Sequence, residues 1–87
     1  MNTQFLLLAQ YNGKTIIPAA AVSKDFFNLT ESQFTRKCSA GQIRLPLVRM
    51  EGSQKCAKGV HLQDLAEYLD ARREAAKKEL AQLTGAT

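Results

Sequence analysis

One long helical pattern in the last quarter of the chain constrains the fold more than any other feature. Apolar residues recur at three-, four- and seven-residue steps along one side of residues 61–83, at Leu62, Leu65, Leu69, Ala76, Leu80 and Leu83. Such a helix of roughly 22 residues is about 33 Å long. A compact chain of 87 residues has a radius of gyration of only about 12 Å. The helix is therefore expected to extend past the body formed by the other residues.

The extending part of this helix would expose Ala76, Leu80 and Leu83 to water. A second copy of the chain is the simplest cover for such a stripe, through a symmetric contact. We therefore expect a homodimer whose oligomerisation contact contains Leu69, Ala76, Leu80 and Leu83. The alternative is that these side chains fold back on residues 5–8 of the same chain.

Two short helices are expected in the first half of the chain. Pro18 is suited to a first helical position, and the alanines after it favour a helix over about residues 18–27. Thr30 and Gln33 form a capping-box pattern that starts a second helix, and Gly41 is placed to end it. The short turn between them is typical of a helix-turn-helix.

Residues 3–11 are apolar without a clean alternation and are followed by Asn12 and Gly13. One interpretation is a short helix with Thr3 as its cap. The other is a hairpin strand joined by the Asn-Gly turn to residues 15–17. The helix is slightly favoured, because no β-branched residue lies inside the segment.

The segment after Gly41 favours strands. Residues 43–50 are predicted to be extended, and Pro46 restricts them to the edge of a sheet. Residues 51–59 are polar and contain two glycines and two lysines, which indicates a loop, and Val60 begins or forms a short return strand. This order of elements predicts a mainly α fold with a small β-hairpin: one winged helix-turn-helix domain over residues 1–87, of the excisionase or MerR type, with a long C-terminal helix.

The positive charge of the chain is concentrated in its middle. Net charge is +4 overall. Residues 36–58 carry six lysines and arginines against Glu51 alone, or +5, whereas residues 1–35 sum to zero and residues 59–87 to −1. A localised basic surface on a small domain is typical of a protein that binds a polyanion. A solvated basic face without a partner is the alternative.

In a winged helix the second helix lies in the major groove and the wing reaches flanking backbone or the minor groove. The residues expected to bind double-stranded DNA are therefore the outward polar and basic side chains of the second helix and the hairpin: Ser32, Thr35, Arg36, Lys37, Ser39, Arg44, Arg49, Ser53, Gln54, Lys55 and Lys58.

Each hairpin cation also has a structural explanation. Arg44 could pair with an acidic residue of the last helix, and Arg49 with Glu51. Lys55 and Lys58 could keep an edge strand from aggregating. Such structural explanations fit Arg36 and Lys37 less well, because these two adjacent cations lie on a short capped helix.

Several classes of function are not favoured. His61 is the sole histidine, and with Cys38 and Cys56 it cannot complete a four-ligand zinc site. No phosphate-binding glycine loop or nucleophile–base pair is apparent, so we expect no enzyme, metal or cofactor. The longest apolar run, Phe5 to Ala9, is too short to span a bilayer, and no basic segment precedes it as in a secretory signal. A cytoplasmic, nucleoid-associated bacterial protein is expected.

Five stretches of the sequence resemble the pyocin activator protein (PrtN) family: MNTQFLLLAQYNG, IIP, KCSAGQIRLPLVRMEGSQK, KGVHLQDLAEYLDARR and QLTG. The resemblance covers residues 1–85. It implies a transcriptional activator of phage-derived gene clusters, including bacteriocin genes, that binds boxes upstream of promoters, with RNA polymerase as a further candidate partner. Two alternatives remain open: an excisionase-like architectural protein that bends DNA, and an adaptor that docks through the C-terminal helix.

Overall fold

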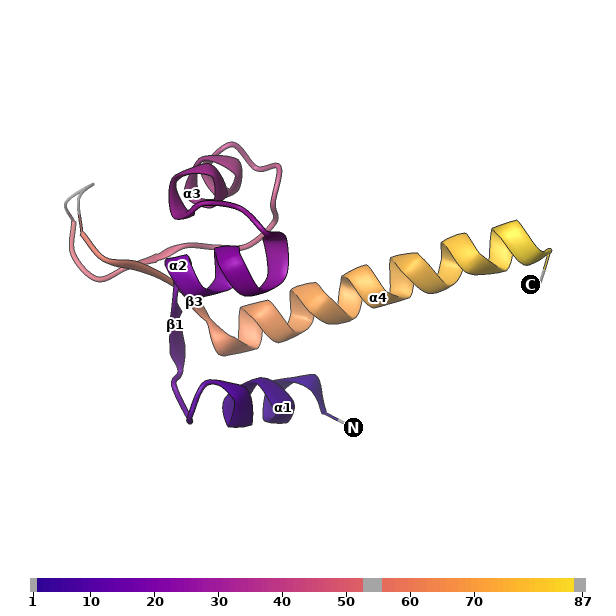
Figure 1. Cartoon of the computed structure of the whole chain (residues 1–87), viewed down its shortest axis with the longest axis horizontal. Coiled ribbons are helices and arrows are strands. Elements are labelled where there is room, and N and C mark those ends of the chain that lie inside the picture. Colours follow the sequence, from indigo (N-terminus) through magenta and orange to yellow (C-terminus); the bar gives the residue numbers. More distant parts are fainter. Residues whose placement is uncertain (1, 53–55, 86–87) are drawn as a thin grey trace.

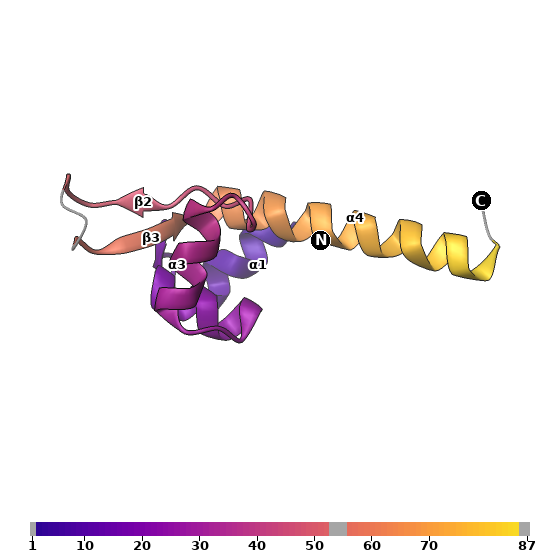
Figure 2. The same cartoon turned by 90° about the horizontal axis from the view of Figure 1, so that it is seen from above.

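The computed structural model describes residues 2–52 and 56–85. The elements follow one another as α1 (Thr3–Gln10), β1 (Ile16–Pro18), α2 (Ala19–Val22), the π-helical turn η1 (Ser23–Phe27), α3 (Glu31–Ser39), β2 (Val48–Arg49), β3 (Lys58–His61) and α4 (Leu62–Thr84). The molecule is elongated, 50 × 29 × 19 Å. The β2–β3 hairpin projects at one end and α4 at the other (Figures 1 and 2). The fold is thus mainly helical with a small antiparallel sheet and a long C-terminal helix.

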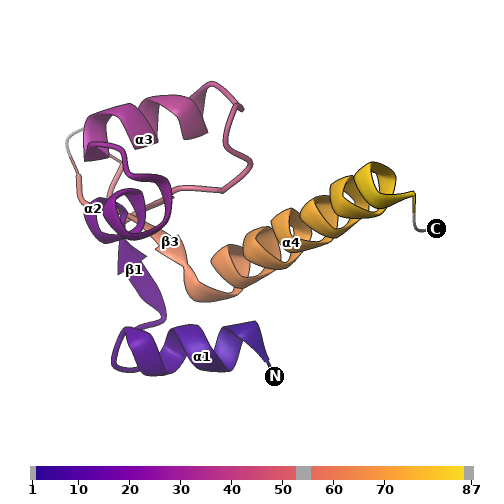
Figure 3. The ribbon, with the colours of Figure 1, turned by 45° about the vertical axis from the view of Figure 1, so that its right-hand side comes forward.

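The core is built where the sheet, α2 and α3 meet the first turns of α4. Its fully buried side chains come from different elements: Ile17, Val22, Phe34, Val60 and Leu65. α1 and α3 lie on opposite sides of this core, with α2 and the sheet between them (Figure 3). α3 therefore has one apolar face on the core and one face free for a partner.

The sheet has the order β1-β3-β2, with antiparallel pairing throughout. Strand β2 lies at the edge, as expected, but it is only two residues long rather than extending over 43–50. Ile43 and Leu45 are instead buried in the core. That segment alternates inward and outward without a strand partner, which explains why it has a strand-like sequence pattern.

A strand over residues 15–17 was expected only in the hairpin alternative, where it pairs with residues 5–9; strand β1 pairs with β3 instead. Pro18, assigned to the start of a helix, ends β1 and precedes α2, which begins at Ala19. The strand is anchored by β3 at Gly59, whose missing side chain leaves room for β1: a Cβ there would lie 2.9 Å from the carbonyl oxygen of Ile17. The close approach of the two strands therefore requires glycine at this position.

The helix expected over 18–27 is present, but its second half is a π-helical turn. The turn ends at Asn28, whose φ of +53° is left-handed. Within the turn both Phe26 and Phe27 pack against the core. Phe27 contacts the rings of Phe34 and Tyr68, with centroids 5.1 and 5.7 Å away. The wider turn therefore joins α3 and α4 through one aromatic side chain.

Residues 3–11 form the helix α1 rather than a hairpin strand. Its cap is Asn2, whose side chain accepts hydrogen bonds from the backbone N–H groups of Gln4 and Phe5. The expected cap, Thr3, instead donates to Asp70 on α4 at 2.6 Å. The hydrogen bond aligns α1 with the first half of α4, beside which it lies in Figure 1.

Tyr11 ties the end of α1 to η1. Its hydroxyl donates to the carboxylate of Asp25 at 2.7 Å, and its ring contacts Phe26 with centroids 6.5 Å apart. Burial, and then the hydrogen bond and negative charge of Asp25, raise the pKa of Tyr11 above its ordinary value of 10. The neutral phenol is therefore the form that the fold favours.

α4 changes character along its length. Leu62 and Leu65 are buried and Leu69 packs against the core, whereas Leu80 is 61 % and Leu83 86 % exposed. The fold-back alternative is therefore wrong, since the overhanging leucines remain uncovered. The expected bounds are correct to one residue, because His61 caps the helix and Gly85 ends it with φ +73°. Within the described residues, no helix is both long and apolar enough to cross a bilayer.

Candidate nucleic-acid interface

The face of α3 is set by two local signals at its ends. The capping box forms as predicted: the side chain of Thr30 accepts from the backbone of Gln33, and the Gln33 side chain accepts from the backbone of Thr30. At the other end, Gly41 adopts φ +78°, and the N–H of Gln42 donates to the carbonyl of Lys37 at 2.9 Å. Both ends are thus fixed by the sequence itself.

Between these ends, Phe34 turns inward and is fully buried. Cys38, on the same side, packs against the core, where burial raises the pKa of its thiol. Ser32, Arg36 and Ser39 are exposed on the opposite side. The helix therefore presents a polar face with hydroxyl groups on either side of one arginine.

The hairpin places two cations directly opposite each other. Arg49 of β2 is paired with Lys58 of β3 in the antiparallel ladder. The ladder continues beyond them through the hydrogen bond from the N–H of Met50 to the carbonyl of Ala57, at 3.1 Å. Because directly opposed residues share one face of a sheet, both side chains project toward the same surface. Like charges in such a pair destabilise the hairpin.

These two elements form one groove. Six side chains line a shallow concave surface of about 510 Å³: Ser32, Thr35, Arg36, Ser39, Arg49 and Lys58. All six were candidate DNA-binding residues, and none carries negative charge. The hydroxyl of Thr35 donates to the carbonyl of Ser32 at 3.2 Å. Neither Arg36 nor Arg49 forms an ion pair with another described residue, so the suggested pairing of Arg49 with Glu51 is not formed.

Lys37 lies beside this groove rather than in it. It lines a second hollow together with Gln33 and Gln42, and Arg36 belongs to both surfaces. In the sequence Gln33 was assigned only to the capping box, and Gln42 was not among the candidate residues. Gln33 lies three residues before Arg36, and Gln42 directly follows Gly41, which ends the helix. These positions are the sequence signal that could have identified the two glutamines.

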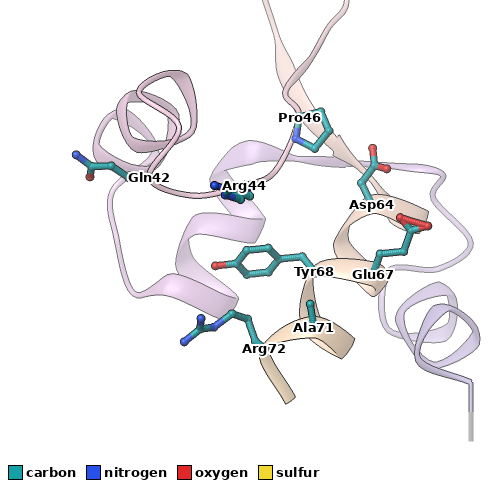
Figure 4. A pocket seen from close by; sticks show the side chains of 8 residues that line it. All are labelled: Gln42, Arg44, Pro46, Asp64, Glu67, Tyr68, Ala71 and Arg72. Atoms are coloured by element: carbon teal, nitrogen blue, oxygen red, sulfur yellow. The ribbon is translucent and has the colours of Figure 1, made fainter. Parts of the chain in front are cut away.

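Arg44 is separated from the groove. It lines a cleft of about 590 Å³ between the segment that follows α3 and the first half of α4 (Figure 4). Asp64 and Glu67 line the same cleft, and Tyr68 and Arg72 complete its α4 side. Arg44 is thus near acidic residues of the last helix, as the alternative held, but forms no ion pair with them in the described structure.

Three of the candidate residues, Ser53, Gln54 and Lys55, lie outside the described residues. Both cysteines are free, and the Cys56 thiol donates to the carbonyl of Glu51 at 3.4 Å. In the part of the chain that the structure describes, no three histidine, cysteine, aspartate or glutamate side chains are grouped to hold a metal ion.

The fold and the groove together define a class: a small, mainly helical protein with a three-stranded antiparallel sheet and a basic groove beside a capped helix. The model of the family described as pyocin activator protein PrtN matches residues 3–76. The chain belongs to this family, which implies an activator of pyocin genes. No curated protein and no solved structure matched the chain.

Proposed function

We propose that the protein is a sequence-specific DNA-binding transcriptional activator of pyocin-type genes and binds DNA as a winged helix-turn-helix. In this proposal α2 with η1 is the first helix of the motif, α3 is the recognition helix, and the β2–β3 hairpin is the wing. The binding form is a homodimer on promoter DNA. Family membership supports the activator role, and the basic groove supports the mode of binding.

The single observation that carries the proposal is the convergence of α3 and the hairpin. Residues 32–39 and residues 49–58 are separate in the sequence, yet their polar and basic side chains line one groove without an acidic group. Phosphate contacts need cations and hydroxyls, and base contacts need side chains with directional donors. Both are available here, on a rigid helix and on a strand pair.

Arg36 is the residue best placed for base recognition. It projects from the middle of the exposed face of α3, and its planar guanidinium can donate two parallel hydrogen bonds to O6 and N7 of guanine. Ser32 and Ser39 are exposed on the same side, where they can contact phosphates or bases. α3 is nine residues long, which suits insertion into the major groove.

Arg49 and Lys58 suit the neighbouring backbone. They come from paired strands, so their spacing is fixed by the ladder. Two cations held opposite each other can share one phosphate. The hairpin therefore offers an anion two positive charges at a fixed spacing.

The direct test is binding to DNA from upstream of the pyocin-type genes of the same genome, measured by fluorescence anisotropy at low salt with footprinting. Wild-type protein is expected to protect a defined box. The Arg36→Ala, Arg49→Ala double variant is expected to lose the footprint, whereas Arg44→Ala, a matched change outside the groove, retains it. Unchanged binding by the double variant would contradict the proposal.

A promoter reporter separates activation from an architectural role. With the box placed upstream of a promoter, the wild-type protein is expected to increase transcription, and the double variant is not. Binding with bending but without increased transcription would favour the excisionase-like alternative.

A further inference from the structure

The projecting half of α4 carries the largest uncovered aliphatic surface on the long helix. Leu83 is 86 % and Leu80 61 % exposed, and Ala76 is exposed between them and the body. They continue the stripe whose first members, Leu62 and Leu65, are buried in the core. Because the same stripe is buried in one half and bare in the other, the second half lacks a covering surface.

We propose that this surface is covered by the same surface of a second copy, in an antiparallel dimer with Ala76 at the two-fold axis. A contact about such an axis must be self-complementary, so that each residue meets its mirror position in sequence. Leu69 and Leu83 are each seven residues from Ala76, so Leu69 at the edge of the body would meet the partner's Leu83. The small side chain of Ala76 allows the two helices to approach closely at the axis.

The charges on α4 favour this direction over the parallel one. Arg72 and Glu79 lie seven residues apart on one flank of the apolar stripe. In the antiparallel arrangement Arg72, four residues before Ala76, lies within one residue of the level of the partner's Glu79, three residues after it, and the pair occurs twice. In a parallel arrangement this flank would instead face the opposite flank of the partner, so Arg72 would meet the partner's Lys77, which is unfavourable. Glu74 has a partner within its own chain, Lys77, at 3.4 Å.

The position of the body also limits the register. The stripe is buried at Leu65 and packs against the core of its own chain at Leu69, so a second helix lying on the stripe has to stop near Leu69. A copy centred on Ala76 places its own Leu83 there, one residue before its helix ends at Thr84. The length of the overhang and the start of the body are thus consistent with one register.

Cysteine cross-linking tests the register without DNA, so its failure is distinct from a failure of DNA binding. In a background with Cys38→Ala and Cys56→Ser, the Ala76→Cys variant is expected to form an interchain disulfide on mild oxidation. Lys78→Cys, about 200° around the helix, is the matched control and is expected to stay uncross-linked. Leu83→Cys is also expected to stay uncross-linked, because two such residues would lie about 21 Å apart in an antiparallel pair, well beyond disulfide reach.

Cross-linking at Leu83 would indicate a parallel dimer and overturn the register. Equal cross-linking at Ala76 and Lys78 would indicate random collision and overturn the contact. Circular dichroism of each variant shows whether the fold is retained.

Sedimentation equilibrium on proteins with native cysteines provides a second, independent measurement. Leu83→Glu is expected to weaken the dimer at least tenfold without loss of helix, since the side chain is exposed in the isolated copy. Arg72→Glu and Glu79→Arg are each expected to weaken it, and the double variant to restore it, because the swapped charges again face each other. A wild-type protein that is monomeric at high concentration, or a double variant no better than either single one, would overturn the proposal.

Discussion

The groove between α3 and the hairpin and the cleft beside α4 are similar in form but different in charge. Both are open hollows of comparable volume, about 510 and 590 Å³, and each contains two or more cations. None of the described residues that line the groove is acidic, whereas Asp64 and Glu67 stand beside Arg44 and Arg72 in the cleft. A phosphate entering the cleft would meet two carboxylates. The difference in acidic groups, more than the presence of arginine, therefore distinguishes the surface that we propose binds DNA.

The largest expected effect comes from displacing the strand that forms one wall of the groove. In Gly59→Ala the new methyl group would lie 2.5 Å from a side-chain methyl of Ile16 and 2.9 Å from a backbone oxygen of Ile17. Overpacking of this kind costs about 1–3 kcal/mol of the free energy of unfolding, which urea denaturation measures. Gly52→Ala is the control, because nothing lies within 4 Å of its Cβ position. Equal stability of the two variants would show that β1 and β3 can separate without cost.

Arg36 and Arg44 offer the next test, because both arginines are exposed and one lines the groove whereas the other lines the cleft. Arg36→Ala is expected to lower affinity for the target box by about 1–3 kcal/mol, or roughly 5- to 150-fold, because a bidentate contact to one base is lost. Its affinity for unrelated DNA should fall much less. Arg44→Ala is expected to change neither affinity. Competition binding with specific and unrelated duplexes measures both, and equal losses in the two variants would remove the distinction between groove and cleft.

The strongest sequence predictions concern local signals. Thr30 with Gln33, Gly41 and Gly85 set helix ends through contacts within a few residues, and each lies where the sequence placed it. β1 depends on pairing with β3, far along the chain, and the local pattern at residues 15–17 indicated a strand only in the hairpin alternative, with the wrong partner. The π-helical turn likewise depends on contacts of Phe27 with α3 and α4.

Contacts between distant parts of the chain also decide which candidate residues belong to the site. The charge of residues 36–58 indicated a basic surface, and α3 and the hairpin do meet in one groove. Arg44 belongs to the same charged segment, but the turn at Gly41 and the burial of Ile43 and Leu45 direct it toward α4. Charge along a sequence therefore identified the segment, whereas the path of the backbone decided which cations share a surface.

Arg49 allows a finer test through salt dependence. If Arg49 neutralises one phosphate, Arg49→Gln should reduce the slope of log affinity against log salt concentration by about 0.9. Arg44→Gln should leave the slope unchanged, since the acidic cleft releases no counterion from DNA. Binding titrations at four or more salt concentrations give both slopes. A slope that is reduced in the Arg44 variant alone would show that the phosphate contact lies at the cleft and not at the groove.

The smallest expected effect has the opposite sign, and it concerns the free protein. Arg49 and Lys58 are directly opposed in the ladder, and cross-strand pairs of this kind change stability by roughly 0.2–1 kcal/mol. Arg49→Gln removes the like-charge repulsion, so the variant that loses DNA affinity should unfold at slightly higher urea concentration than the wild type. Because Arg49 is exposed, the gain should lie at the low end of this range and diminish as salt screens the charges. Arg44→Gln should show no such gain, since Arg44 stands near carboxylates rather than opposite a cation. A gain in the Arg49 variant that persists in high salt would mean that the hairpin is strained by packing and not by charge, and the opposed pair of cations would then give the groove no extra attraction for an anion.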